Sequence, residues 1–302
     1  MKQKFLLLLF LFLYCVCKAQ TEKIYKTTEV KEINGLIYSL NDSTLVTGKL
    51  VAYNISGEKK VQETTLEDGM PEGLAKEWYE NGMLKQELTF KDGFPEGLSR
   101  QWYENGQLQQ EISIKDSKGE GLSRQWYENG QLSQERNLKD DKGEGLSRQW
   151  HENGQLKYEL NFKDGKGEGL SRQWYKNGQI SQEFLLKDDV PEGLIRVWHE
   201  NGQLRNEKIF KEGMPEGLDK QWSKNGKLEF KTIWKRGSNE GVSEEYYESG
   251  QLKSKGESIH EIQEDNKSYK KIGIWEEYNE QGKLKAKITY RFGKKIKTEN
   301  FD

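Results

Sequence analysis

Apolar and polar residues alternate in short runs that return at a fixed interval along most of the chain. In one unit, a first run covers residues 98–103 and a second covers residues 107–114. Asn105-Gly106 separates them, and Lys115-Asp116 ends the second run. Alternating runs bounded by turn residues are typical of β-strands, and Asn-Gly between two of them is the strongest local signal of a β-hairpin. Each unit therefore predicts strand, tight turn, strand and loop.

The unit repeats every 24 residues. Its phase is marked by Gly73, Gly97, Gly121, Gly145, Gly169, Gly193, Gly217 and Gly241. The Asn-Gly dipeptide keeps the same phase, with turn-defining glycines at Gly82, Gly106, Gly130, Gly154, Gly178, Gly202 and Gly226. A fixed period in this range indicates a repeat protein in which each unit packs only on its neighbours. We therefore predict an all-β fold, an elongated single-layer or solenoid-like antiparallel sheet with one β-hairpin per 24 residues.

Two registers fit the hairpin, and they differ in the length of the turn. If Asn105-Gly106 alone makes a type I′ turn, Leu108 lies opposite Tyr103 and apolar groups fall on both faces of the sheet. If the loop has three residues, Leu108 lies opposite Trp102 and most apolar groups gather on one face. We prefer the shorter turn, which places an Arg–Glu pair, worth about 0.2 to 1 kcal/mol, across the strands of successive units. These pairs are Arg100 with Glu111, Arg124 with Glu135, Arg148 with Glu159, and Arg172 with Glu183.

Composition supports an extended rather than a compact object. Hydrophobic residues make up 33% of the chain and charged residues 32%, which is too polar for a compact globule of this length. Such a composition also fits a disordered chain. The tryptophans argue against disorder, because they keep strict phase at Trp78, Trp102, Trp126, Trp150, Trp174, Trp198 and Trp222.

The first residues are unlike the repeats. Lys2 and Lys4 precede an apolar run over residues 5–16, and small residues follow up to Ala19. This pattern predicts a signal peptide over residues 1–19, cleaved near Ala19, and hence an exported protein of the periplasm, the cell surface or the medium. The apolar run is shorter than the roughly 20 residues that a membrane-spanning helix needs. A lipoprotein is disfavoured, since Tyr14 and Val16 rather than small residues precede the two cysteines.

Cleavage would remove both cysteines, leaving no disulfide and no thiol chemistry. It would also remove three lysines, which changes the formal net charge from −2 to −5. A mildly acidic surface of mixed charge argues against nucleic-acid binding.

The remaining chain divides by how closely it keeps the repeat. Residues 20–47 are predicted to cap the open edge of the sheet, and residues 48–72 to form a degenerate repeat in which Tyr53 and Gly57 keep the phase. Regular hairpins follow over residues 73–254. Residues 255–272 hold a polar insertion with His260, which is either a binding loop or a tolerated surface loop. Residues 273–302 form a terminal repeat and a basic tail.

Candidate chemistry is sparse. Two of the three histidines, His151 and His199, take the place of the tyrosine that follows tryptophan in other units. The sequence holds no HExxH, CxxC or phosphate-binding glycine motif, so we predict no enzyme activity, no cofactor and no metal site. Acidic turns such as residues 140–144 lack the glycine spacing of calcium-binding β-rolls and carry lysines in place of ligands. They predict solvated loops.

Two stretches resemble a known family. The run WYENGQL from Trp102 to Leu108, followed by Lys-Asp and a further Glu-Gly, is similar to the MORN-repeat variant of bacterial antitoxins of the YwqK family, which belong to toxin–antitoxin systems. The head, with residues 35–38 and 47–49, also resembles the start of such proteins. The resemblance covers nearly the whole mature chain. It implies a β-hairpin sheet used in protein or membrane association.

These observations predict a non-catalytic, exported scaffold for protein interaction, with an antitoxin-like or immunity-like role as its narrower form. The seven ladder tryptophans are the candidate partner-binding residues, because aromatic rings at regular pitch suit the anchoring of a protein. The same rings can instead form the core of the sheet. As an alternative function, they stack on sugar rings in an envelope glycan-binding module. Contact with a membrane or cell-wall glycan stays open, as do the partner's identity and the oligomeric state.

Overall fold

The computed structural model describes residues 22–260 and 269–301. The predicted signal peptide, residues 1–19, lies outside the described residues. Among the described residues the fold is all-β apart from one short 3₁₀ helix, η1 (Thr27–Glu29). No helix in this part of the chain is long and apolar enough to cross a membrane.

The chain divides into two compact units, the first ending at Lys118 and the second beginning at Gly119. The strands of the first unit are β1 (Ile24–Lys26), β2 (Val30–Ile33), β3 (Leu36–Ser39), β4 (Gly48–Tyr53), β5 (Lys60–Glu67), β6 (Met70–Trp78), β7 (Leu84–Lys91), β8 (Phe94–Pro95), β9 (Gly97–Trp102) and β10 (Leu108–Lys115). From β4 onward each of them pairs antiparallel with the next along the chain, the short β8 lying beside β9 against β7.

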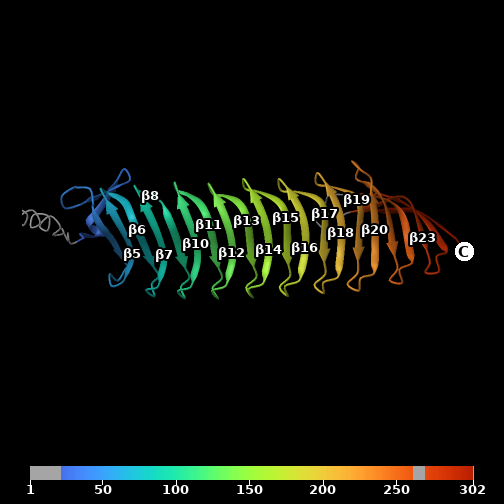
Figure 1. Cartoon of the computed structure of the whole chain (residues 1–302), viewed down its shortest axis with the longest axis horizontal. Coiled ribbons are helices and arrows are strands. Elements are labelled where there is room, and N and C mark those ends of the chain that lie inside the picture. Colours follow the sequence, from blue (N-terminus) through green and yellow to red (C-terminus); the bar gives the residue numbers. More distant parts are fainter. Residues whose placement is uncertain (1–21, 261–268, 302) are drawn as a thin grey trace, which may run out of the picture. The chain divides into compact units, whose positions relative to one another are not determined.

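The second unit continues the same pattern. Its strands are β11 (Lys118–Trp126), β12 (Leu132–Lys139), β13 (Lys142–Trp150), β14 (Leu156–Lys163), β15 (Lys166–Trp174), β16 (Ile180–Lys187), β17 (Val190–Trp198), β18 (Leu204–Lys211), β19 (Met214–Trp222), β20 (Leu228–Trp234), β21 (Glu240–Tyr246), β22 (Leu252–His260), β23 (Tyr269–Tyr278), β24 (Leu284–Arg291) and β25 (Lys294–Asn300). Consecutive strands pair antiparallel from β11 to β25, and Figure 1 shows them in chain order. The predicted sheet of repeated hairpins is confirmed.

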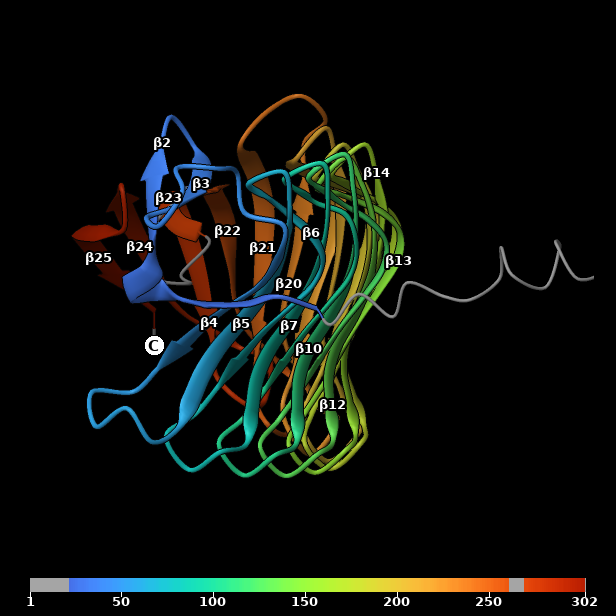
Figure 2. The same ribbon diagram turned by 90° about the vertical axis from the view of Figure 1, so that its left-hand side faces the viewer.

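The head of the first unit lies on the edge of β4. Strand β1 pairs with β4 in parallel, which makes the sheet mixed. Gly48 permits this approach, since a Cβ there would lie 2.2 Å from the carbonyl oxygen of Lys23. Tyr25, Val46 and Leu66 form a small buried cluster beneath it. The separate hairpin β2–β3 reaches the β5–β6 turn through the bond from Ile37 N to Gly69 O, 2.9 Å long (Figure 2).

The tight type I′ turns lie at the acidic ends of the units and not at Asn-Gly. Between β14 and β15, both Asp164 (φ 52°) and Gly165 (φ 83°) have positive φ, and Lys163 pairs directly with Lys166. Positive φ at both central residues defines type I′, whose twist matches that of the flanking strands. The segments predicted as loops between repeats are therefore two-residue turns. Within each compact unit, consecutive hairpins pair directly, as β12 pairs with β13.

The Asn-Gly turn is longer than the preferred prediction, which was wrong at this point. Only Gly106 (φ 83°) has a positive φ there, whereas Asn105 does not. The amide of Tyr103 donates to Gln107 O (2.8 Å), and that of Gly106 donates to Tyr103 O (2.9 Å). This is a three-residue loop with a bulge, in which Asn105 Oδ1 accepts from Gln107 N at 2.9 Å.

The bulge combines the two predicted registers. Beside the turn, Trp102 lies opposite Leu108, as the longer loop requires. Beyond the register shift, Arg100 lies opposite Glu111, as the shorter turn requires. Leu108 therefore shares a face with Trp102, whereas the preferred register had placed it on the other face.

The two faces of each sheet differ in what they bury. The serine face carries Ser99, Ser123, Ser147 and Ser171, all buried. The tryptophan face carries the ladder tryptophans, because residues an odd number of positions apart in a strand point to opposite sides. The buried Leu138 and Leu160 lie on the serine face. There the Phe162 ring covers Gly143, where a Cβ would lie 3.1 Å from Cγ of the ring.

At the far end of the second unit, strands form in part of the polar insertion, which was predicted as a loop, and in the basic tail. The described ends of the polar insertion continue β22 and β23, with Ser258 opposite Lys271 and His260 opposite Tyr269. The rest of the insertion lies outside the described residues. The basic tail forms β25 against β24.

The type I′ turns predict how substitutions at their second central residue change the free energy of unfolding. Gly165→Ala forces an L-residue to φ 83° and should destabilise the fold by about 1 to 2 kcal/mol. Ser117 holds the equivalent position at φ 61°, so Ser117→Gly removes that strain and should leave stability unchanged or higher. Urea midpoints from circular dichroism measure both. Equal destabilisation by the two substitutions would contradict the turn assignment.

Candidate functional site

The seven ladder tryptophans occupy one structural position. Each is the last residue of its strand and pairs with the first apolar residue after the turn, for example Trp126 with Leu132 and Trp150 with Leu156. All seven are only partly buried. The structure therefore places the predicted binding residues in a row on each unit's tryptophan face, while the most buried side chains lie on the serine face.

A row of ion pairs runs beside the tryptophans. Arg100, Arg124 and Arg148 each hold their predicted glutamate at 2.8 Å from Nε to Oε2, and Arg172 does so at 2.9 Å. In the second unit each glutamate also faces the arginine of the following hairpin, as Glu135 faces Arg148. Each pair is partly exposed, so it contributes modestly to stability. The row mainly sets a charge pattern of alternating sign along the tryptophan face.

A tyrosine or histidine directly after a ladder tryptophan links its hairpin to the next one. Tyr127 and Tyr175 donate from OH to the carbonyl oxygens of Trp150 and Trp198 at 2.7 and 2.6 Å. His151 Nε2 makes the same contact to Trp174 O at 3.0 Å, as His199 does to Trp222 O at 2.9 Å. A carbonyl oxygen only accepts, so Nε2 carries the proton. The two histidines thus substitute for tyrosine in structure as well as in sequence.

The turn residues are also engaged with their neighbours. The seven predicted turn glycines have φ between 74° and 87°. Asn153 and Asn177, which precede two of them, donate from Nδ2 to the carbonyl oxygens of Lys176 and Glu200 in the next turn, at 2.7 and 2.9 Å. These residues therefore fix the geometry of the turns and the spacing between hairpins.

The acidic turns use their carboxylates internally. Glu144 Oε2 accepts from the amide of Asp164 at 3.0 Å, and Glu192 accepts from that of Glu212 at 2.9 Å. Asp141 Oδ1 accepts from Gly119 N at 2.6 Å. The two glutamates satisfy amides of tight turns, which accounts for the glutamate of the recurrent Glu-Gly, whereas Asp141 satisfies an amide of strand β11. Among the described residues no three acidic, histidine or cysteine side chains gather as metal ligands would.

The serine face carries a row of glutamine amides that the sequence analysis missed. In the second unit Gln134 lies opposite both Gln125 and Gln149, and Gln173 lies opposite Gln182. In the first unit Glu77 lies between Gln62 and Gln86. The sequence contained a signal for this row, because these glutamines recur in phase with the repeat. Only the register of the strands shows that they lie on one face.

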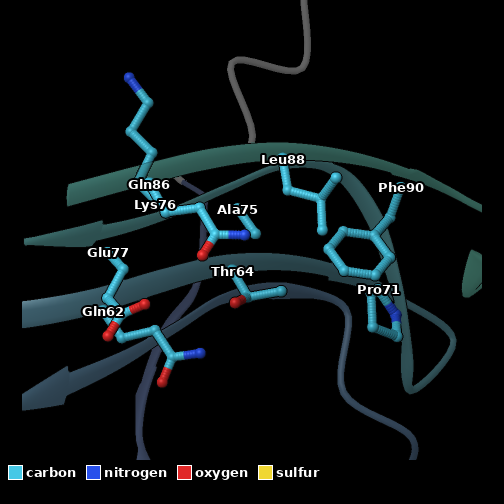
Figure 3. Close-up of a pocket in the computed structure, with 9 residues that line it drawn as sticks. All are labelled: Gln62, Thr64, Pro71, Ala75, Lys76, Glu77, Gln86, Leu88 and Phe90. Carbon is cyan, nitrogen blue, oxygen red and sulfur yellow. The ribbon is translucent and has the colours of Figure 1, made fainter. Parts of the chain in front are cut away.

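A pocket opens on the serine face of the first unit. Its volume is about 270 Å³, and strands β5, β6 and β7 form its floor. Gln62, Thr64, Glu77 and Gln86 supply polar groups, and Pro71, Ala75, Leu88 and Phe90 supply apolar ones. Figure 3 shows Gln62, Glu77 and Gln86 at one end and Phe90 with Pro71 at the other.

The serine face of β20–β24 holds a second departure from the repeat. Phe230 stacks on Tyr269 with centroids 4.4 Å apart, and the fully buried Trp275 lies beneath Lys271, whose Nζ is 4.0 Å from the ring centroid. Gly256 makes room, since a Cβ there would lie 2.5 Å from the Trp275 ring. Large side chains from flanking strands therefore meet above a small residue, and they form an aromatic core.

Charged groups are built into this aromatic core. Glu245 accepts from Ser254 Oγ (2.6 Å) and Lys271 Nζ (2.9 Å). Burial acts to raise the pKa of Glu245, but these bonds outweigh it and the pKa is lowered. Asp219 and Lys208, both buried, pair at 3.3 Å nearby. Burial and the charge of Lys208 lower the pKa of His260.

A family model for the MORN repeat variant matches eight segments of the chain, which together cover more than half of it. They are residues 71–92, 95–116, 119–140, 143–164, 167–188, 191–212, 239–260 and 271–291. Strands β19 and β20 fall between two matched segments yet form the same hairpin. No curated protein matches the chain.

The tyrosine–carbonyl link can be tested at His151. His151→Phe removes the hydrogen bond to Trp174 O and should lower stability by about 1 kcal/mol. His151→Tyr restores a donor to the same carbonyl and should return stability to the starting value. Thermal unfolding followed by circular dichroism compares the three proteins. Equal losses in both variants would contradict the proposed equivalence of histidine and tyrosine.

The lowered pKa of Glu245 predicts how the stability that this residue contributes depends on pH. A carboxyl whose folded pKa lies below its ordinary value of 4.5 adds stability above that pH and loses it as the pH falls through the folded value. Glu245→Gln should therefore destabilise the protein at pH 7. The difference from the unsubstituted protein should shrink between pH 5 and about pH 3. Urea midpoints at each pH measure this, and a constant difference would contradict it.

Proposed function

The chain belongs to the MORN repeat variant family, and from this we propose that it is a non-catalytic, exported interaction module that docks a partner protein on its tryptophan face. Repeats of this family generally serve in protein or membrane interactions. No catalytic activity attaches to the family. The narrower role that we propose is immunity-like, in which the module occludes an effector protein.

One observation carries this proposal. Tryptophans that keep strict phase stay partly exposed, although the neighbouring strands bury Leu138, Leu160 and Phe230 on the serine face. Aromatic anchors beside arginine are the residues in which protein-binding energy concentrates. The arginines and glutamates beside the tryptophans form a row of charges that alternate in sign. Such a row favours a partner whose charges are complementary, and it favours one register of that partner.

The polar groups that recur in every unit support recognition rather than catalysis. Tyrosine, histidine, asparagine and glutamate side chains bind backbone groups of the neighbouring hairpin. A catalytic site needs distinct groups that converge on one reacting atom. Export rests on the sequence of residues 1–19 alone, and mass determination of the mature protein tests it, with Gln20 expected as the first residue.

Site-specific crosslinking tests the docking face. Benzoylphenylalanine replaces Trp126 or Trp150 on the tryptophan face, and Gln149 on the serine face as the matched control. At positions 126 and 150 an aromatic residue replaces an aromatic residue, so the fold should be kept, and circular dichroism checks the fold of all three variants. We expect irradiated envelope extracts to give one protein adduct from positions 126 and 150 and none from position 149.

The alternative ligand for the same face is envelope glycan. Co-sedimentation with purified peptidoglycan that is lost in Trp126→Ala and Trp150→Ala would contradict the protein-partner proposal. Crosslinking from position 149 as efficient as from position 150 would contradict the choice of face. If the captured partner is a toxic effector, its activity should fall on addition of the module, whereas unchanged activity would contradict the immunity-like role.

A further inference from the structure

The pocket of the first unit has the composition of a site for a small polar ring. Three neighbouring strands present Gln62, Glu77 and Gln86 side by side, since Gln62 pairs with Glu77 and Glu77 with Gln86. Among the described residues, neither glutamine amide makes a hydrogen bond within the protein. Each primary amide offers two donors and one acceptor oxygen, so together they can bind several hydroxyl groups at once.

The carboxylate between the amides is held in place. Lys85 Nζ binds Glu77 Oε1 at 2.7 Å, and the structure gives Oε2 no donor from any described residue. Oε2 is thus an acceptor with a fixed direction. Lys76 is the one cationic side chain among the lining residues, and Figure 3 shows its ammonium group pointing away from the pocket. Because the Glu77–Lys85 pair carries no net charge and the two amides are neutral, the polar end suits a neutral ligand.

The opposite end of the pocket is apolar. Phe90, Leu88, Pro71 and Ala75 line it, and Figure 3 shows the Phe90 ring beside Pro71 and below Leu88. Pro71 occupies the repeat position of Gly143, over which the Phe162 ring packs. Ala75 occupies the repeat position of the buried Ser99 and Ser123.

We propose that this pocket binds one pyranose ring of a neutral glycan. A pyranose has hydroxyl groups around its rim and an apolar C–H face, which match the amide end and the Phe90 end. A volume of about 270 Å³ lies below the range of pockets for drug-sized ligands, so it accommodates a single ring. The site lies on the opposite face from the tryptophan ladder and does not depend on the proposed protein partner.

Calorimetric titration of the mature protein with two soluble probes tests the site. Triacetylchitotriose carries acetamido groups, and cellotriose carries hydroxyl groups in their place. Comparing the affinities of the two sugars shows which kind of sugar ring the pocket prefers. We expect saturable binding of at least one. Ala75→Leu fills the pocket and Gln86→Leu removes an amide, and each should weaken binding at least tenfold. Gln134→Leu is the control, because it makes the same change at the same repeat position in the second unit, and it should bind as the unsubstituted protein does.

Three results would overturn the assignment, provided that circular dichroism shows each variant folded. The first is no saturable heat with either sugar. The second is unchanged binding in Ala75→Leu. The third is equal weakening by Gln134→Leu, which would place the binding elsewhere on the glutamine row. Binding of an extended peptide without either sugar would likewise assign the pocket to protein. Crosslinking from the tryptophan face tests a different surface. The sugar-binding proposal and the protein-docking proposal can therefore fail independently of each other.

Discussion

The structure depends on the pairing of each hairpin with the next through tight turns. A chain that is one-third hydrophobic and one-third charged cannot build a large interior, so its stability comes from contacts that recur once per unit. Those contacts are specific. The Tyr127 hydroxyl binds the carbonyl of the following tryptophan, Asn153 binds the next turn, and Glu144 satisfies an amide in the type I′ turn beside it. Each joins one hairpin to its neighbour at a fixed phase.

Most of the polar side chains that could suggest a catalytic or metal site in the sequence form these contacts between hairpins. His151 and His199 replace tyrosines in a backbone contact, and acidic residues such as Glu144 accept hydrogen bonds from turn amides. The groups left over are partly exposed tryptophans with their ion pairs on one face and glutamine amides on the other. These groups are arranged along rows rather than about one reacting atom. Such an arrangement agrees with the protein or membrane interactions in which repeats of this family generally serve.

Places where the repeat changes are the most informative about function and packing. Pro71 stands where Gly143 stands in a later unit, and a pocket opens beside it. Gly256 stands beneath the ring of Trp275, and an aromatic core closes over β20–β24. In both places the side chains on the serine face differ in volume from those of the regular repeat.

The sequence by itself determined the period, the hairpin in each repeat and the all-β class, because these follow from local alternation and turn residues. It also predicted the Arg–Glu pairs, but from a two-residue turn that is not present, and the pairs form because a bulge restores that register. It misassigned the type I′ turn, since Asn-Gly fits both a two-residue turn and the last two positions of a three-residue loop. Only the tertiary structure decided that Leu108 shares a face with Trp102, that the glutamines form one row, and that the pocket at Phe90 exists. A one-residue bulge inverts side-chain direction, and its position depends on cross-strand hydrogen bonds rather than on any local residue pattern.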